Sequence, residues 1–134
     1  EIEKYTIKVA LDLDESIPMI LFDVIHIQRV ITNFMCNGIE AMHTSKTMEP
    51  QLWITTKKMA MMAVVDIVDN GPGLLTEDIQ LLLEPYFSTK KKGRGMGLSI
   101  SNTLIQAHGG KLSIKNHCEL GAWIQFTLPF KGIR

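Results

Sequence analysis

The chain has 134 residues, of which 46% are hydrophobic and 21% charged, so it is large enough for one globular domain, residues 1–134, that folds without disulfides or metals. Its 14 basic and 14 acidic residues balance, which excludes a general electrostatic attraction to nucleic acid or to an anionic membrane. Cys36 and Cys118 form no CxxC motif, and a reduced, cytoplasmic setting fits them better than a disulfide framework or a zinc site.

The first third of the chain predicts a strand followed by a long helix. Residues 5–11 alternate in polarity as strands do, and residues 14–18 resemble a turn. From Asp23 to Met42, apolar residues such as Phe34 recur at helical spacing, which indicates a helix with one buried face. The chain starts at Glu1, directly before the first strand, which favours a fragment of a longer protein.

Two asparagines, Asn33 and Asn37, lie four residues apart in this predicted helix and therefore on one face of it. Asparagine is a poor helix former, so the presence of two asparagines within a helix indicates a specific role for them. An amide oxygen is a suitable ligand for Mg²⁺, which takes few protein ligands and completes its shell with phosphates and water. The alternative is a buried pair of amides that ties the helix to the sheet. Asn37 is the better candidate for the metal, and Asn33 for the support of phosphate or backbone.

A loop over 43–50 leads into two predicted strands, 51–58 and 62–69, that form a hairpin. The second strand places Asp69 at the end of an otherwise apolar row on one face. A buried carboxylate needs a donor, and the exocyclic amine of a planar heterocycle would supply one.

The turn after this strand, NGPG, contains two glycines that would let the backbone approach a flat ligand closely, Gly71 and Gly73. The alternative is a simple turn in which Asp-Asn ends the strand.

The second half of the chain predicts a short helix over 76–83, a long basic loop over 84–97, a helix from about Gly97 to His108, and a closing hairpin of strands 111–116 and 122–128. With the first half, these elements predict an α+β two-layer sandwich, in which a mixed sheet of about five strands carries three helices on one face.

The glycines at the end of the basic loop, Gly93, Gly95 and Gly97, run directly into a helix. Backbone N–H groups at a helix N-terminus bind anions, and the lysines and Arg94 add positive charge beside them. The alternative is a flexible linker. The spacing matches neither the Rossmann nor the Walker motif, so it predicts a phosphate loop of another design.

These motifs, taken in order, resemble those of the catalytic ATP-binding domain of sensor histidine kinases, within the superfamily that includes Hsp90, gyrase B and MutL. The segment QRVITNFMCNGIEAM (28–42) is similar to the N box, and DNGPG (69–73) to the G1 box. EPYFSTK (84–90) is similar to the F box and GRGMGLS (93–99) to the G2 box. The resemblance covers essentially the whole chain, and its details are closest to kinases of the nitrogen- and oxygen-sensing type.

The resemblance implies the Bergerat fold, with ATP and Mg²⁺ as ligands. It implies that Asp69 accepts the adenine amino group, that Gly71 and Gly73 shape the adenine slot, and that Asn37 ligates Mg²⁺ with Asn33 beside it. A mobile lid would extend from Tyr86 to Met96, with Phe87 as its anchor. The catalytic residues implied are Asn33, Asn37 and Lys90, and the further nucleotide-binding residues are Tyr86, Phe87, Ser88, Thr89, Arg94, Gly95, Met96, Gly97 and Leu98.

Two positions depart from the family pattern without an expected loss of a nucleotide contact. Gly38 stands where the family usually has alanine, which should loosen the helix by somewhat less than about 1 kcal/mol. Leu120 replaces the first glycine of a usual GGA, and a local structural adjustment is expected there.

The identity of residue 33 distinguishes kinases from hydrolases in this superfamily. Relatives that hydrolyse ATP carry a glutamate there as a base, whereas the amide of Asn33 cannot accept a proton at neutral pH. The resemblance therefore implies an ATP-dependent protein histidine kinase that transfers the γ-phosphate to a histidine on a separate dimerisation domain. None of the four histidines of this chain is followed by an acidic residue, as the family's acceptor typically is.

The partners that the resemblance implies are ATP or ADP, the dimerisation domain of the same protein and a downstream response regulator, but no nucleic acid and no membrane. The domain is expected in the cytoplasm, whether or not a longer parent protein is anchored in a membrane. Two alternatives stay open. One is a protein-serine kinase or anti-sigma regulator of the same fold, and the other is a non-catalytic nucleotide-binding module.

Overall fold

The computed structural model describes residues 7–18, 22–74, 95–117 and 119–130, and within these ranges it has two helices and five strands. The helices are α1 (Val24–Thr44) and α3 (Gly95–Ala107). The strands are β1 (Lys8–Asp12), β2 (Gln51–Met59), β3 (Met62–Asp69), β4 (Leu112–Asn116) and β5 (Ala122–Pro129). The third helix expected over 76–83 lies outside the described residues.

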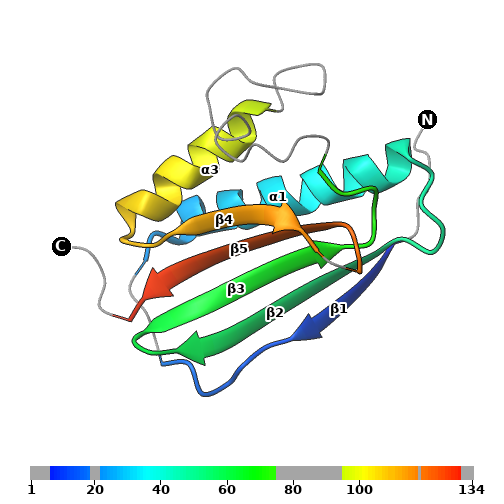
Figure 1. Cartoon of the computed structure of the whole chain (residues 1–134). Helices are drawn as coiled ribbons and strands as arrows, with labels where there is room; N and C mark the ends of the chain where they lie inside the picture. Colours follow the sequence, from blue (N-terminus) through cyan, green and yellow to red (C-terminus); the bar gives the residue numbers. More distant parts are fainter. Residues whose placement is uncertain (1–6, 19–21, 75–94, 118, 131–134) are drawn as a thin grey trace.

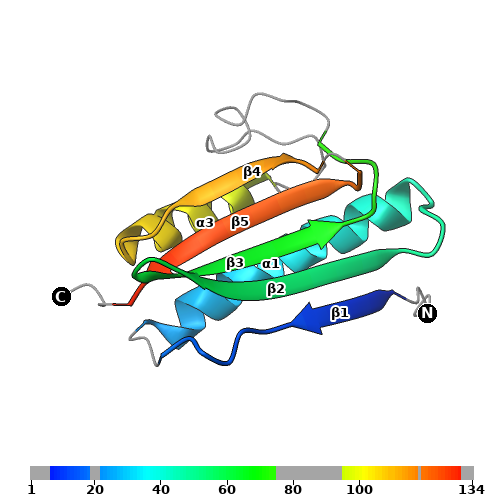
Figure 2. The same ribbon diagram turned by 60° about the horizontal axis from the view of Figure 1, so that its bottom comes forward.

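The five strands form one mixed sheet in the order β1-β2-β3-β5-β4. Strand β1 pairs with β2 in parallel, and the other three pairings are antiparallel. Both described helices lie against the same face of the sheet, as the two views in Figures 1 and 2 show. The predicted α+β two-layer sandwich with a mixed five-stranded sheet is therefore confirmed.

The core lies between this face of the sheet and the two helices. Alternation along the strands directs Leu52, Ile67 and Phe126 toward the helices, where they are almost completely buried. The ring of Phe34 on α1 packs against that of Phe126 on β5, with 6.4 Å between the ring centroids. The apolar stripe that predicts the first helix is thus its buried face.

Helix α1 begins after Asp23, whose carboxylate accepts a hydrogen bond from the backbone N–H of His26 and caps the first turn. It continues to Thr44, two residues beyond the predicted end at Met42. Helix α3 begins at Gly95 and ends at Ala107, whereas the sequence predicts a start near Gly97. The helix thus includes the last two glycines of the basic loop.

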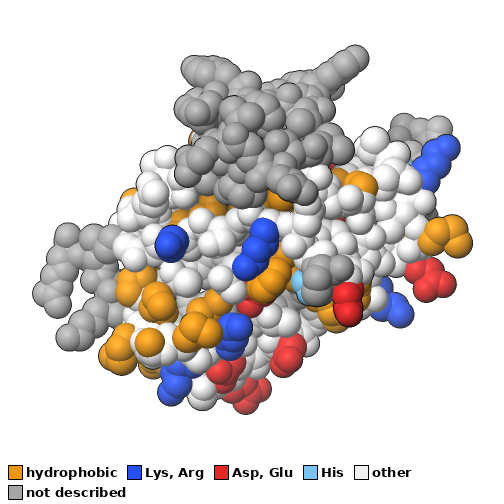
Figure 3. All heavy atoms as spheres, in the orientation of Figure 1, with side chains coloured by type: hydrophobic (Ala, Val, Ile, Leu, Met, Phe, Trp, Pro, Cys, Tyr) orange, Lys and Arg blue, Asp and Glu red, His pale blue; other side chains and the backbone are white. Residues whose placement is uncertain are grey.

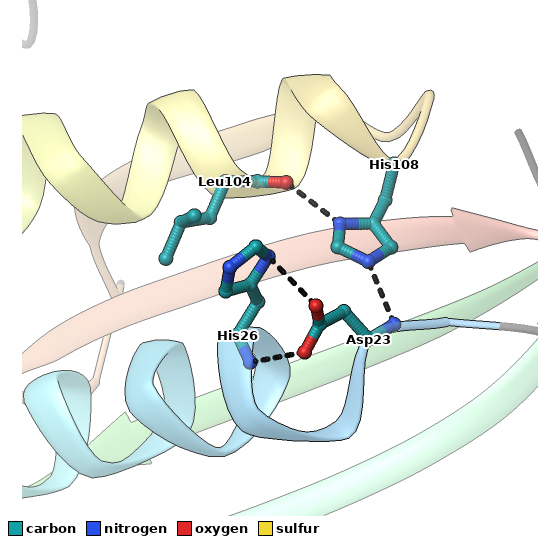
Figure 4. A network of polar contacts seen from close by, with 4 residues as sticks. All are labelled: Asp23, His26, Leu104 and His108. Carbon is teal, nitrogen blue, oxygen red and sulfur yellow. Dashed lines mark hydrogen bonds and ion pairs between the residues drawn. The ribbon is translucent and has the colours of Figure 1, made fainter.

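The two helices run antiparallel, and His108 joins the end of α3 to the start of α1 (Figure 4). The backbone N–H of Asp23 donates to Nε2 of His108 at 3.0 Å, so Nε2 carries no proton. The proton is therefore on Nδ1, which donates to the carbonyl of Leu104 at 2.9 Å. This pair of bonds sets the position of one helix along the other.

The face of the sheet opposite to the described helices has a polar network of its own. Asp66 on β3 is buried, and its Oδ1 accepts hydrogen bonds from the indole N–H of Trp123 at 2.7 Å and from the amide of Gln125 at 2.9 Å. Because side chains alternate along a strand, Asp66 and Asp69 point to opposite faces. Asp66 is therefore a structural carboxylate on the same strand as Asp69.

The two ends of the sheet differ in character. The turn between β2 and β3 exposes Met59 and Met61, and hydrophobic side chains gather at this end of the face seen in Figure 3. Asp69 and the turn that follows it lie at the other end, because β3 runs from Met62 to Asp69.

Truncation of Ile105 tests the contribution of α3 to the core. Ile105 is fully buried, so Ile105→Ala should lower the free energy of unfolding by about 2–5 kcal/mol. The matched control is Ile25→Ala on α1, where the side chain is 74% exposed, and a change within about 0.5 kcal/mol is expected. Urea denaturation measures both, and equal losses would contradict this placement of the core.

Candidate functional site

The carboxylate of Asp69 ends the helix-facing row of β3 and is only 6% exposed. Its neighbours on the strand, Val65 and Ile67, belong to the core or pack against it, as the alternation in the sequence predicts. Burial of an ionised carboxylate is unfavourable unless hydrogen bonds replace the lost water. The hydrogen-bond donors around Asp69 therefore determine whether its ionised carboxylate can be buried at this position.

Backbone N–H groups from two segments supply these hydrogen bonds. Oδ1 of Asp69 accepts from the N–H of Gly71 at 2.9 Å and from the N–H of Ala122 at 3.2 Å. The N–H of Gly121 donates to the backbone carbonyl of Asp69 at 2.8 Å. The carboxylate is thus oriented by its own turn and by the start of β5, which sequence reasoning did not predict.

The second carboxylate oxygen, Oδ2, faces helix α1. A Cβ atom placed on Gly38 would lie 3.1 Å from Oδ2 and 3.3 Å from a methyl carbon of Leu52. Gly38 is thus the residue at which the helix passes the carboxylate. The expectation that the glycine at this position affects only the helix is therefore incomplete, since it also determines the space beside Asp69.

Two further glycines allow the backbone to pack around Asp69. A Cβ on Gly121 would overlap Oδ1 of Asp69 and lie 2.8 Å from the backbone nitrogen of Gly71. A Cβ on Gly71 would lie 2.9 Å from Cγ of Met42 and 3.2 Å from Oδ1 of Asp69. Leu120 replaces the first glycine of the family's GGA and is 40% exposed, so its side chain has room. Gly121, the second glycine of that pattern and the one that packs against Asp69, is retained.

Asn70, which lies between Asp69 and Gly71 in the sequence, has the structural role that the simple-turn interpretation assigns to it. Its side-chain oxygen accepts a hydrogen bond from the N–H of Gln51 at 2.9 Å, and its amide group donates to the carbonyl of Glu49 at 3.0 Å. These bonds tie the turn to the start of β2. Asp69 and Asn70 are therefore adjacent in sequence but differ in function, since only Asp69 faces the helices.

The predicted amides of α1 lie beside α3. The side chain of Asn33 donates to Oγ of Ser101, a fully buried residue on α3, at 3.4 Å. Because the helices are antiparallel, one turn further along α1 and one turn back along α3 bring Asn37 to the level of Gly97. This spacing puts the partly buried Asn37 at the level of the first turn of α3, which contains Gly95 and Gly97.

Several predicted site residues lie outside the described residues. These are Tyr86, Phe87, Ser88, Thr89, Lys90 and Arg94. The backbone of Gly95, Met96 and Gly97 forms the first turn of α3, and Leu98 packs against the core. The predicted lid, Tyr86 to Met96, overlaps the first turn of α3 at Gly95 and Met96, and the rest of it lies outside the described residues.

In the described part of the chain, no group of three or more His, Cys, Asp and Glu side chains could hold a metal ion. Neither described helix is long and apolar enough to cross a membrane.

Comparison with protein families gives one match over most of the chain. Residues 22–132 match the family described as histidine kinase-, DNA gyrase B- and HSP90-like ATPase. The chain is 36% identical to sensor protein FixL of Bradyrhizobium diazoefficiens over 124 residues, which are 92% of this chain and 24% of FixL. It is 35% identical to nitrogen regulation protein NtrY of Azorhizobium caulinodans over 115 residues, or 83% of this chain and 15% of NtrY. It thus spans about a quarter or less of these relatives.

Solved structures agree with the fold. The catalytic domain of histidine kinase ThkA in a nucleotide-free form superposes with a TM-score of 0.78 at 30% identity, covering 93% of this chain and 80% of that one. Full-length ShkA in complex with AMPPNP gives a TM-score of 0.78 at 24% identity over 95% of this chain and 26% of ShkA, which supports the fold alone. The chain belongs to the histidine kinase-, DNA gyrase B- and HSP90-like ATPase family, in which its relatives are sensor histidine kinases.

Proposed function

We propose that this domain binds ATP with Mg²⁺ and transfers the γ-phosphoryl group to a histidine on a separate dimerisation domain of a two-component sensor kinase. The observation that carries the proposal is the buried carboxylate of Asp69, held by two backbone N–H groups and approached by Gly38 on α1, in a chain of this ATPase family. The cytoplasm as its location and a response regulator as the downstream partner belong to the same proposal.

Asp69 would recognise the purine. Oδ2, the oxygen that faces α1, would accept a hydrogen bond from the exocyclic amine of adenine. The turn that contains Gly71 and Gly73 would form one side of the slot for the base. A charged acceptor in a buried position favours a base with an amine over one with a carbonyl at the same position.

Asn37, at the level of the first turn of α3, would hold Mg²⁺ on the polyphosphate side of the site. The ion, when bound, would neutralise phosphate charge. Backbone N–H groups at the start of α3 would hold phosphate oxygens, which a helix N-terminus favours. Lys90 and Arg94 would add positive charge from the preceding segment.

The transfer needs positioning and charge stabilisation more than it needs a base in this domain. The attacking group would be the imidazole nitrogen of the acceptor histidine, which forms a bond to the γ-phosphorus while the bond to the bridging oxygen breaks and ADP leaves. The side chain of Asn33, which donates to Ser101, cannot act as the base that activates water. Slow hydrolysis in the absence of an acceptor follows.

Incubation with γ-labelled ATP, Mg²⁺ and dimerisation domains of related sensor kinases tests the reaction. Label that appears on a dimerisation domain only when this chain is present, and that acid removes, is expected, because phosphohistidine is acid-labile. Acid-stable label would instead support a serine kinase. Tight nucleotide binding without transfer to any dimerisation domain would support a non-catalytic module.

Substitution of Asp69 tests recognition of the base. Asp69→Asn keeps Oδ1 as an acceptor for the two backbone N–H groups but places an amide donor at the position of Oδ2. ADP affinity, measured by isothermal titration calorimetry, should fall about 10- to 100-fold, as expected for loss of a hydrogen bond to a charged group.

Asp66→Asn is the matched control, since it makes the same change on the same strand but on the opposite face of the sheet. It should leave ADP affinity unchanged. Wild-type affinity in Asp69→Asn, or equal losses in both variants, would argue against Asp69 as the residue that reads adenine.

Substitution of Asn37 tests the metal site. The ratio of ADP affinities with and without Mg²⁺ should fall at least about tenfold in Asn37→Ala, because the amide oxygen is lost as a ligand. Gln28→Ala removes an exposed amide from the same helix and should preserve the ratio. An unchanged ratio in Asn37→Ala would exclude this residue as a ligand of the ion.

A further inference from the structure

Asn116, the last residue of β4, connects the edge of the sheet to the turn that follows β3. Its side-chain oxygen accepts a hydrogen bond from the backbone N–H of Leu74 at 2.7 Å, across 42 residues of sequence. Among the described strands, β4 pairs with β5 alone, and β5 separates it from β3. The bond to Leu74 is therefore a side-chain link from β4 to the far end of the Gly71–Gly73 turn.

The same side chain lies close to Gly73. This glycine has φ = +86°, a conformation that residues with a Cβ rarely adopt. A Cβ on Gly73 would lie 2.6 Å from Oδ1 of Asn116, well inside van der Waals contact. The turn thus passes directly over the amide, and two separate constraints require glycine at position 73.

Two side-chain oxygens bracket this turn. At its start, Oδ1 of Asp69 accepts from the N–H of Gly71 at 2.9 Å, and at its end Oδ1 of Asn116 accepts from the N–H of Leu74. The two acceptors lie close together at the same end of the sheet, because Asn116 on β4 is paired with Ala122 on β5, and the N–H of Ala122 donates to Asp69 on β3. The position of the turn relative to Asp69 is fixed from both ends.

We propose that Asn116 is a positioning residue of the nucleotide site, which holds the Gly71–Gly73 turn at the distance from Asp69 that a purine requires. This inference rests on the proposed function, since it concerns the affinity of the same site. Asn116 itself need not touch the nucleotide. Its effect should appear in recognition of the base and nucleoside, which the turn would contact, and not in contacts with the outer phosphates.

The test compares Asn116→Ala with Asn116→Asp. The alanine variant loses the acceptor, whereas a carboxylate at the same position still accepts from the N–H of Leu74. Titration calorimetry should show AMP and ADP bound about 3- to 10-fold more weakly by Asn116→Ala, the ratio expected for loss of one hydrogen bond. The factor should be the same for both nucleotides, and Asn116→Asp should restore the affinity to within about twofold.

Amide hydrogen exchange at Leu74 supplies a second measurement that does not depend on nucleotide. The N–H should be protected in the wild-type chain and in Asn116→Asp, and should exchange faster in Asn116→Ala. If the alanine variant does not fold, the aspartate variant decides. Protection of Leu74 with near wild-type affinity supports the proposal, and loss of either one overturns it.

The outcomes separate this proposal from the proposed function. A wild-type chain that binds neither AMP nor ADP contradicts the nucleotide site itself. Wild-type binding that persists in Asn116→Ala overturns the positioning role and leaves the nucleotide site intact. A loss in Asn116→Ala that Asn116→Asp does not restore shows that the oxygen acceptor is not the reason for the effect, and it also overturns the proposal.

Discussion

The structure around the candidate site depends on the burial of one carboxylate. Asp69 ends an apolar row on a central strand, and apolar side chains cannot replace the hydrogen bonds to water that its carboxylate loses on burial. Two backbone N–H groups do so here, and they come from segments distant in sequence, the turn after β3 and the start of β5. For these donors to reach one oxygen, the backbone must pass closer than a side chain allows. This is why a side chain cannot be accommodated at position 121, and why one at position 71 would be tightly packed against Oδ1 of Asp69 and Met42.

The antiparallel packing of α1 and α3 extends this constraint to the other half of the site. Hydrogen bonds at His108 fix the relative position of the two helices at one end, and the contact between Asn33 and Ser101 lies further along. The same packing brings Asn37 level with the first turn of α3. Helical spacing from the Asn33–Ser101 contact thus puts an amide of one helix at the level of the start of the other. In the proposed site, both groups would lie on the polyphosphate side.

Local patterns were sufficient to predict most of the fold. Alternation in the strands and the helical stripe through Val30 and Phe34 predict elements that the structure reproduces within a few residues. Element ends were less predictable, since the start of α3 falls within a run of alternating glycines that a helix and a loop can both contain. The burial of Asp69 followed from its place on β3, because alternation fixes the face of a strand without any tertiary information.

The supports of Asp69 could not be predicted in this way. The donors from Gly121 and Ala122 depend on how β5 lies beside β3, and the contact of Asn116 with Leu74 depends on β4 as well. These are pairings between strands distant in sequence, and a residue such as Asn116 has no local signal that separates it from an ordinary strand-ending asparagine. Topology is needed before its role can be seen.

Gly38 shows how two local preferences compete where helix and carboxylate meet. Glycine within a helix costs up to about 1 kcal/mol relative to alanine, which by itself favours alanine. In this structure, however, the added Cβ would lie 3.1 Å from Oδ2 of Asp69, whose other oxygen is held by two backbone donors. Displacement of the carboxylate would weaken hydrogen bonds to a charged acceptor, each worth about 1.5–3 kcal/mol. Whether Gly38→Ala stabilises or destabilises the domain therefore depends on whether Asp69 can shift by a few tenths of an ångström and keep its two backbone donors.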